Sequence, residues 1–197
     1  MNFLDVRTII VGHIVTDAVC TVVLVALWIQ NRKRFAGTGH WLGDFVLQTA
    51  APALVVVRGS VPDWLSMTFA NTLAILGGVV GYIGLTRFAG KKSAQVHNYV
   101  LLAVFAAVHA YFVYIRPNLA ARNIEMALAL FIICFQCVWL ILRRVEHSMR
   151  RLMREVGLVF GIFCLVSLIR IVVIPITPPS GNDFFQSGLY DTLVLLS

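Results

Sequence analysis

Charged side chains are scarce in this sequence, and acidic ones are the scarcest. Only 13% of the 197 residues are charged, with 9 Asp and Glu residues among them, whereas 59% are hydrophobic. A soluble domain carries about 25% charged residues. The apolar residues also form blocks of about 17 to 24 residues, long enough to cross ~30 Å of hydrocarbon as helices. The composition therefore excludes an ordinary soluble domain and predicts an integral membrane protein.

Recognisable catalytic and metal-binding motifs are also lacking. The sequence contains no HExxH, P-loop or GxSxG motif, and no set of Cys and His residues at the spacing of a metal site. The 4 cysteines lie inside apolar blocks, and we interpret them as buried packing residues: Cys20, Cys134, Cys137 and Cys164. The sequence thus predicts no catalytic residue, metal or cofactor, and the chain is not expected to be an enzyme.

The basic residues outnumber the acidic ones and give a formal net charge of +7. A nucleic-acid partner is not expected, because these residues lie in short segments beside apolar blocks, which is the pattern of membrane topology. They gather after the first, third and fifth blocks: Arg32, Lys33, Arg34, Arg87, Lys91, Lys92, Arg143, Arg144, Arg150, Arg151 and Arg154. Since cytoplasmic loops are rich in Lys and Arg, the N-terminus is predicted to lie outside.

The apolar blocks predict an all-α membrane protein, a single helical domain over residues 1–197. Six complete transmembrane spans are expected at residues 6–29, 41–57, 65–85, 98–115, 124–142 and 156–174. A partial seventh begins at residue 189, and residues 189–197 are too few to cross a bilayer, which takes about 20. We expect either a half-inserted end or a truncated sequence. The basic segment 143–155 predicts a helix that lies on the membrane surface or extends a span into the cytoplasm.

A charged break, RGSVPD at residues 58–63, separates the second and third apolar blocks. It predicts a tight external hairpin that starts with Arg58. Pro62 suits the entrance of a helix, where its missing N–H costs nothing. Asp63 is expected to cap the N-terminus of the third span, where the helix dipole favours a carboxylate. The main role of this segment is therefore predicted to be architectural.

Ionisable and amide side chains inside the spans are candidates for function, because such groups are costly in lipid. His13 and Asp17 share one face of the first span at a spacing of four residues. Asn71, His109 and Arg170 lie in the same half of the bilayer on the third, fourth and sixth spans. We expect these residues to converge on a ligand cavity open to the outside. Arg58 is a further candidate for its wall.

Two alternatives to a ligand cavity stay open. The polar groups can pair only to hold helices together, or lie close enough to the headgroups to reach water. Glu125, at the outer start of the fifth span, fits this structural role best. A b-type haem with His13 and His109 as its two ligands is a further alternative. Its only support is the similar depth of the two histidines in the membrane, and no cofactor is predicted.

Three stretches in the first half of the sequence carry a resemblance. They are residues 4–8 (LDVRT), 58–71 (RGSVPDWLSMTFAN) and 84–91 (GLTRFAGK). Over about residues 3–93 the chain resembles the multi-span input region of bacterial diguanylate cyclases with a GGDEF output domain, and of some sensor histidine kinases. Over the remainder it is similar only in its topology. The matching residues are architectural, so the resemblance implies no ligand-binding residues.

The resemblance implies a sensor module in a bacterial inner membrane, whose seventh span leads to a cytoplasmic output domain that this sequence lacks. The expected partners are the lipid bilayer and an unknown small ligand, with a homodimer or larger membrane complex as a further expectation. One alternative is a non-catalytic accessory or scaffold subunit of a membrane complex. A small transporter is the second alternative, although the two halves do not repeat in the way typical of secondary transporters.

Overall fold

The computed structural model describes residues 6–31, 36–91, 94–145 and 147–177, and every regular element within these ranges is a helix. The elements are α1 (Val6–Asn31), α2 (Thr38–Val56), η1 (Trp64–Phe69), α3 (Ala70–Phe88), α4 (Val96–Ala110), η2 (Tyr111–Ile115), α5 (Leu119–Arg144) and α6 (His147–Ile176). The short elements η1 and η2 are π-helical. One runs directly into α3 and the other continues α4, so the described residues form six rods.

Five stretches of the described residues are long and apolar enough to cross a membrane, which confirms the prediction of a helical membrane protein. They are Ile10–Asn31, Trp64–Phe88, Val96–Ile115, Leu119–Arg143 and Met153–Ile176. Helix α2, which coincides with the predicted second span, is not among them. Its apolar character is interrupted by His40, Asp44, Gln48 and Pro52. The predicted seventh span at 189–197 lies outside the described residues.

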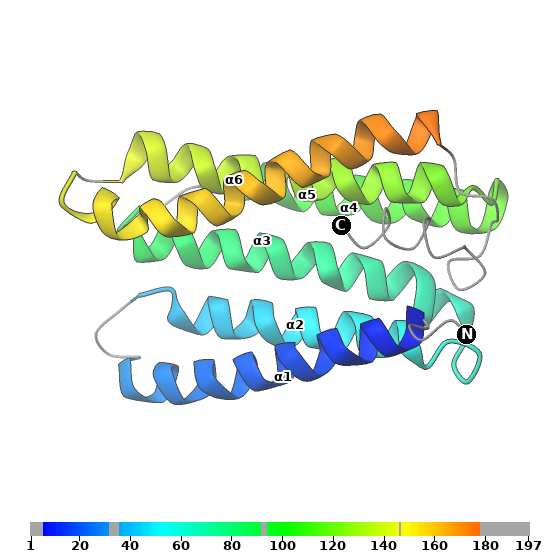
Figure 1. Ribbon diagram of the computed structural model, residues 1–197, viewed down its shortest axis with the longest axis horizontal. Helices are drawn as coiled ribbons and strands as arrows, with labels where there is room; N and C mark the ends of the chain where they lie inside the picture. The colour runs from blue at the N-terminus through cyan, green and yellow to red at the C-terminus, as the bar shows by residue number, and fades with distance from the viewer. Residues whose placement is uncertain (1–5, 32–35, 92–93, 146, 178–197) are drawn as a thin grey trace.

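The rods pack side by side along one direction (Figure 1). Helices α1 and α2 are neighbours, α2 packs on α3, α3 packs on α5, and α5 packs along α6. The buried core lies between α3, α4 and α5, where Val79, Phe105 and Ile133 are each at most 3% exposed. Large apolar side chains are exposed along α1 and α6, as expected for helices that face lipid: Val15, Val19, Val22, Ile162, Leu165 and Val172.

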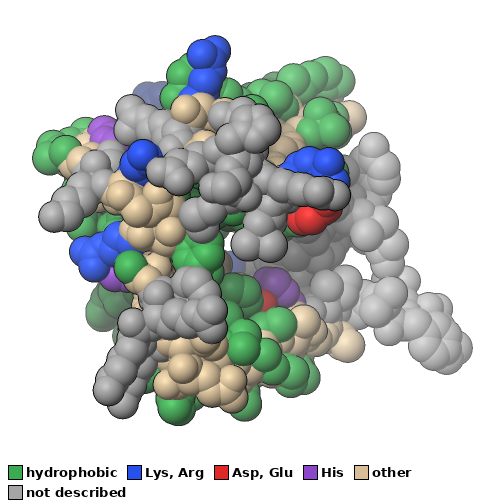
Figure 2. Space-filling view, turned by 90° about the vertical axis from the view of Figure 1, so that its left-hand side faces the viewer, with side chains coloured by type: hydrophobic (Ala, Val, Ile, Leu, Met, Phe, Trp, Pro, Cys, Tyr) green, Lys and Arg blue, Asp and Glu red, His purple; other side chains and the backbone are tan. Residues whose placement is uncertain are grey.

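The two ends of the bundle differ in character. We call the end that carries the turns at residues 57–63 and 116–118 the hairpin end. The opposite end, which Figure 2 faces, is called the basic end, because exposed Lys and Arg side chains lie on it. They include Arg87, Lys91, Arg143 and Arg154. The turns alternate between these ends along the chain, as in an up-and-down bundle.

Two helices, α5 and α6, begin well before the residues at which the apolar pattern predicts them to start. Helix α5 starts at Leu119, because the Asn118 side chain accepts a hydrogen bond from the Ala121 N–H at 3.0 Å and so caps the helix. Helix α6 starts at His147 and runs unbroken to Ile176. The sequence predicts that the basic segment 143–155 either lies on the membrane surface or extends a span. The continuous helix α6 shows that most of this segment extends a span.

The hairpin at residues 58–63 forms a tight turn, as predicted. Ser60 N–H donates to the Val57 carbonyl at 3.0 Å, and Leu65 N–H donates to the Pro62 carbonyl at 3.0 Å. Asp63 stands at the N-terminus of η1, but its side chain makes no capping hydrogen bond. The capping prediction for Asp63 is therefore wrong. Its backbone is already helical (φ −58°, ψ −34°), whereas a capping residue usually has extended dihedrals that aim its side chain at the free N–H groups.

Helices α2 and α3 approach closely because α3 presents glycines to α2. A Cβ atom on Gly84 would lie 2.7 Å from Trp41 Cδ1 and 3.0 Å from His40 Cβ. A Cβ atom on Gly77 would lie 3.0 Å from Asp44 Oδ1, and one on Gly81 would collide with Asp44 Oδ2. Small residues let helix backbones approach in a membrane, where packing replaces the hydrophobic effect. The glycine face thus holds the polar side of α2 against α3.

The substitution Gly84→Ala is expected to destabilise the protein by about 1–3 kcal/mol, because the new methyl group meets the Trp41 ring and the helices must separate. The matched control is Gly161→Ala on α6, where nothing lies within 4 Å of the new Cβ. There the change is expected to be neutral or stabilising by up to about 1 kcal/mol. Thermal unfolding in detergent micelles measures both. Equal unfolding temperatures for the two variants would contradict the close packing of α2 on α3.

Candidate functional site

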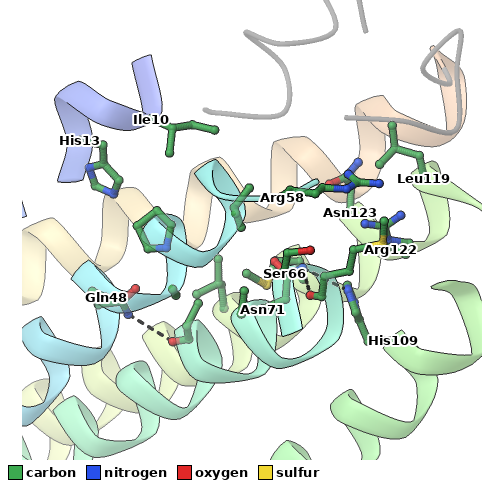
Figure 3. A pocket seen from close by; sticks show the side chains of 18 of the residues that line it. Ile10, His13, Gln48, Arg58, Ser66, Asn71, His109, Leu119, Arg122 and Asn123 are labelled. Carbon is green, nitrogen blue, oxygen red and sulfur yellow. Dashed lines mark hydrogen bonds between the residues drawn. The ribbon is translucent and has the colours of Figure 1, made fainter. Parts of the chain in front are cut away.

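A cavity of about 470 Å³ lies between the helices at the hairpin end (Figure 3). All six α-helices contribute to its walls, as do η1 and the hairpin. Its lining residues are Ile10, His13, Gln48, Ala51, Pro52, Val55, Arg58, Ser66, Met67, Ala70, Asn71, Ala74, His109, Leu119, Arg122, Asn123, Met126, Leu130 and Arg170. Sites for small molecules usually have volumes of this order, with mostly apolar walls and a few polar groups.

The polar part of the wall is basic. Arg58, Arg122 and Arg170 come from the hairpin, α5 and α6, and His13 comes from α1. No carboxylate belongs to the described residues that line the cavity. In Figure 3, Arg58, Arg122 and Asn123 lie toward one side of the cavity, and His13 and Gln48 toward the other. Among the described residues, the ionisable side chains of the cavity wall are therefore all arginine or histidine.

Three polar side chains from three helices meet beside the cavity, and two of them, Asn71 and His109, line it. The Asn71 Nδ2 atom lies 3.2 Å from His109 Nε2, and His109 Nδ1 lies 3.5 Å from Glu125 Oε2. The His109 side chain is 3% exposed and that of Glu125 is 12% exposed. The His109 ring also stacks on Phe105, with ring centroids 5.3 Å apart. This amide, imidazole and carboxylate chain ties α3, α4 and α5 together.

Hydrogen-bond directions determine which imidazole nitrogen carries the proton. The Asn71 amide donates one hydrogen to the Met67 carbonyl at 2.7 Å, so its NH₂ group, and not its oxygen, faces His109. His109 Nε2 then accepts the second amide hydrogen. In the neutral ring the proton is therefore on Nδ1, the atom that lies 3.5 Å from Glu125 Oε2. The three groups form an ordered chain in which Asn71 sets the tautomer of His109.

Both π-helical segments adjoin this chain. The element η1 ends at Phe69, two residues before Asn71, and η2 begins at Tyr111, two residues after His109. They also contact each other, since Thr68 Oγ1 donates to the Tyr114 hydroxyl at 3.4 Å. A π-helical turn contains an extra residue and so rotates the side chains beyond it relative to those before it; such turns are frequent at functional sites. The regular α-helix is therefore interrupted close to both Asn71 and His109.

The structure brings together most of the residues that the sequence predicts for a cavity. His13, Asn71, His109 and Arg170 all line it, and so does Arg58. Asp17 does not line it. Instead its Oδ2 atom lies 3.4 Å from His13 Nε2, one helical turn away on α1. Asp17 therefore contacts a wall residue but does not itself line the cavity, because it lies one helical turn further along α1.

Sequence reasoning missed Arg122 and Asn123 as wall residues and treated Glu125 as an interfacial charge. The cause is the predicted start of the fifth span at residue 124, which left Arg122 and Asn123 in a loop. The available signal was Asn118, a favoured capping residue, followed by the helix-forming segment LAAR. With the helix starting at Leu119, Arg122 ends its first turn, and Asn123 and Glu125 fall in its second.

No family model, curated protein or solved structure matches this chain. The resemblance to the input regions of diguanylate cyclases and histidine kinases therefore stays a prediction.

The contact between Asn71 and His109 predicts a measurable energetic coupling. Asn71→Ala and His109→Ala are each expected to lower the free energy of unfolding by about 1–3 kcal/mol, since each leaves a buried polar group without its partner. The double variant should lose less than the sum, with a coupling energy of about 0.5–3 kcal/mol. Equilibrium unfolding in mixed micelles gives all of these values. The control pairs Asn71→Ala with Glu155→Ala, which is exposed on α6 and should be additive. Additivity in the Asn71–His109 cycle would rule out the contact.

Proposed function

We propose that this chain is a membrane-embedded sensor module of a bacterial inner membrane. It binds a small ligand in the cavity at the hairpin end, which faces outward, and passes the resulting change in helix packing to a cytoplasmic output such as a diguanylate cyclase or histidine kinase. Six spans cross the membrane from an external N-terminus, and the partial seventh leads toward the output.

The observation that carries this proposal is the composition of the cavity wall, to which every α-helix contributes. A ligand there contacts all of the rods at once. A ligand shifts an equilibrium between two packings only when it binds them with different affinity. A site between helices satisfies this requirement, because any relative movement of the helices changes the contacts of the ligand. A site within a single helix pair would not report on the remaining helices.

The polar face of α2 is compatible with a sixth span. Gln48 donates to the Ala74 carbonyl of α3 at 3.2 Å and to Asp44 Oδ1 at 3.4 Å. Asp44 itself lies against the glycine face of α3. The groups that lower the hydropathy of α2 are thus turned toward a neighbouring helix. Intramembrane polar residues normally face the bundle interior in this way.

The topology predicts opposite labelling of two introduced cysteines. Ser60→Cys lies in the hairpin and is expected to react with a membrane-impermeant maleimide applied to the outside of intact cells. Lys91→Cys, exposed at the basic end, should react only after permeabilisation. The unsubstituted protein, whose cysteines lie within helices, supplies the background. The reverse pattern, or labelling of both sites from outside, would overturn the proposed orientation.

Ligand binding predicts a gain in thermal stability that depends on the cavity. The chain in lipid nanodiscs would be screened with small carboxylic acids, phosphate esters, amines and neutral sugars. A compound at 100 times its Kd is expected to stabilise the protein by about 2.7 kcal/mol. This gain should raise the Tm by roughly 5–10 °C for a chain of this size. Ala74→Phe, which fills the cavity, should abolish the rise. Ala103→Phe, on an exposed part of α4, should leave it intact.

Hydrogen exchange then separates a sensor from a simple binding protein. With the stabilising compound bound, amide exchange should change both around the cavity and at the basic end of α3 and α5, near residues 86–88 and 142–145. A change confined to the cavity would overturn the sensor proposal. If no class of compound raises the Tm, the alternative of an accessory or scaffold subunit replaces it.

A further inference from the structure

Aromatic side chains form a strip along α5 that runs toward the basic end of the bundle. Phe131, Phe135 and Trp139 follow one another at intervals of four residues, so they lie on one face of the helix. The ring centroids of Phe131 and Phe135 are 5.9 Å apart, and those of Phe135 and Trp139 are 6.2 Å apart. Phe135 is 49% exposed and Trp139 is 47% exposed. These three residues, which we call the aromatic strip, therefore face lipid when α5 crosses a bilayer.

An arginine continues the aromatic strip at the basic end. The guanidinium carbon of Arg143 lies 5.0 Å from the centre of the Trp139 ring, which is the distance of a cation–π contact. This contact keeps the guanidinium beside the strip, and its N–H donors can bind a phosphate in a bidentate manner. Arg143 is exposed and is the last residue of an apolar stretch long enough to cross a membrane. Its side chain is therefore placed at the depth of the lipid headgroups.

The aromatic strip and Arg143 together have the length of one leaflet. From Phe131 to Arg143 the helix rises by about 18 Å at 1.5 Å per residue. One leaflet contributes about 15 Å of hydrocarbon, because the whole layer measures ~30 Å. With Arg143 at the headgroups, Phe131 then lies near the middle of the bilayer. A lipid whose phosphate contacts Arg143 can therefore lay an acyl chain along all three rings.

The neighbouring helices border the strip on both sides. On one side, His97 Nε2 of α4 lies 3.1 Å from the Oε1 atom of Gln136, the residue after Phe135. On the other side, α6 packs on Ile141, since a Cβ atom on Gly157 would lie 3.3 Å from Ile141 Cγ2. At about 100° per residue, Gln136 and Ile141 fall on opposite flanks of the strip. Within the described bundle, the strip is thus the face of α5 left open between α4 and α6.

Further basic side chains lie at the same end as Arg143. Arg87, Lys91 and Arg154 are exposed there, and Figure 2 shows Lys and Arg side chains over this end of the bundle. Arg154 lies 3.4 Å from Glu155, but both side chains are exposed, so this pair is weak. Each Lys or Arg near an anionic membrane surface strengthens binding by about fivefold. The surroundings of the strip therefore favour a lipid with net negative charge over a zwitterionic one.

We propose that the aromatic strip and Arg143 bind one anionic phospholipid from the leaflet at the basic end. The Arg143 guanidinium holds the phosphate, and an acyl chain lies along the three rings. A lipid fits this surface better than a second copy of the chain does, because the strip combines leaflet length with a cation at headgroup depth. The site is separate from the cavity at the hairpin end and adds a lipid-binding function to the chain, whatever the cavity binds.

Brominated lipids test the site through the fluorescence of Trp139, because bromine atoms on an acyl chain quench a nearby indole. The chain is placed in nanodiscs of phosphatidylcholine with a small fixed fraction of phosphatidylglycerol, and an equal amount of either lipid is brominated. The signal of Trp139 is the difference between the unsubstituted chain and Trp139→Phe. Phosphatidylglycerol is expected to be preferred there by about fivefold or more. Trp64, 57% exposed at the hairpin end and read through Trp64→Phe, is the control ring without such a preference.

Substitution of Arg143 tests the headgroup contact. Arg143→Gln should lower the preference at Trp139 to the level found at Trp64. Arg143→Lys should retain part of it, because the charge stays and the bidentate geometry is lost. Arg116→Gln, exposed at the hairpin end, is the matched control and should leave the preference unchanged. If Arg143→Gln does not elute as a folded species, added salt takes its place, since screening should lower the preference of the unsubstituted chain.

Equal quenching of Trp139 by the two brominated lipids overturns the proposal. A preference that survives in Arg143→Gln, or in high salt where that variant does not fold, overturns it as well. Absence of quenching by both lipids has the same meaning, and a dimeric mass of the protein in the nanodisc would then assign the strip to a second copy of the chain. The proposed sensor function is tested separately, because none of these measurements involves the cavity.

Discussion

Water is absent from the interior of a bilayer, so each polar group of this chain has to find its partner within the bundle. Hydroxyl groups do so locally. Thr21, Thr49 and Thr72 each donate to the carbonyl four residues earlier, at 2.7–2.8 Å. Amides reach to the next helix, as Gln136 does when it donates to Asn98 of α4 at 2.9 Å. Such bonds determine which helices are neighbours, because apolar surfaces pack almost equally well against lipid and against one another.

At the candidate site, polar side chains from several helices surround a cavity instead of only pairing between two helices. Beside the cavity, Asn71 and His109 form a hydrogen bond between α3 and α4, and Glu125 of α5 lies 3.5 Å from the other ring nitrogen of His109. Above them, the arginines surround a space. The two π-helical segments lie at this level of the bundle, where regular α-helix gives way on both α3 and α4. Irregular backbone within a membrane is tolerated where it is buried in protein or lines a cavity, and both conditions are met here.

Much of the fold could be predicted from the sequence, because a helix that crosses a membrane needs a long apolar block. The depth of each polar side chain followed from the same blocks, which is why His13, Asn71, His109 and Arg170 were expected at one level. The contacts between these side chains could not be predicted from depth, since depth does not show which side of a helix faces the bundle. Asp17 shows the limit: it shares a helical face with His13, and yet only His13 lines the cavity. The wall residues of α5 were missed because hydropathy locates the apolar part of a helix and ignores the capped polar turns before it.

The unbroken course of α6 has a mechanical consequence. Its 30 residues make a rod about 45 Å long, which exceeds the thickness of the hydrocarbon layer. Arg170 lies near one end of this rod, at the cavity, and the basic residues that follow His147 lie at the other, about 35 Å away at 1.5 Å per residue. A stiff rod converts a small tilt into displacement. Pivoting by about 5° at the cavity would move the far end by roughly 3 Å. That distance is comparable to the helix shifts by which signalling proteins rearrange their interfaces, so α6 has the dimensions of a lever arm.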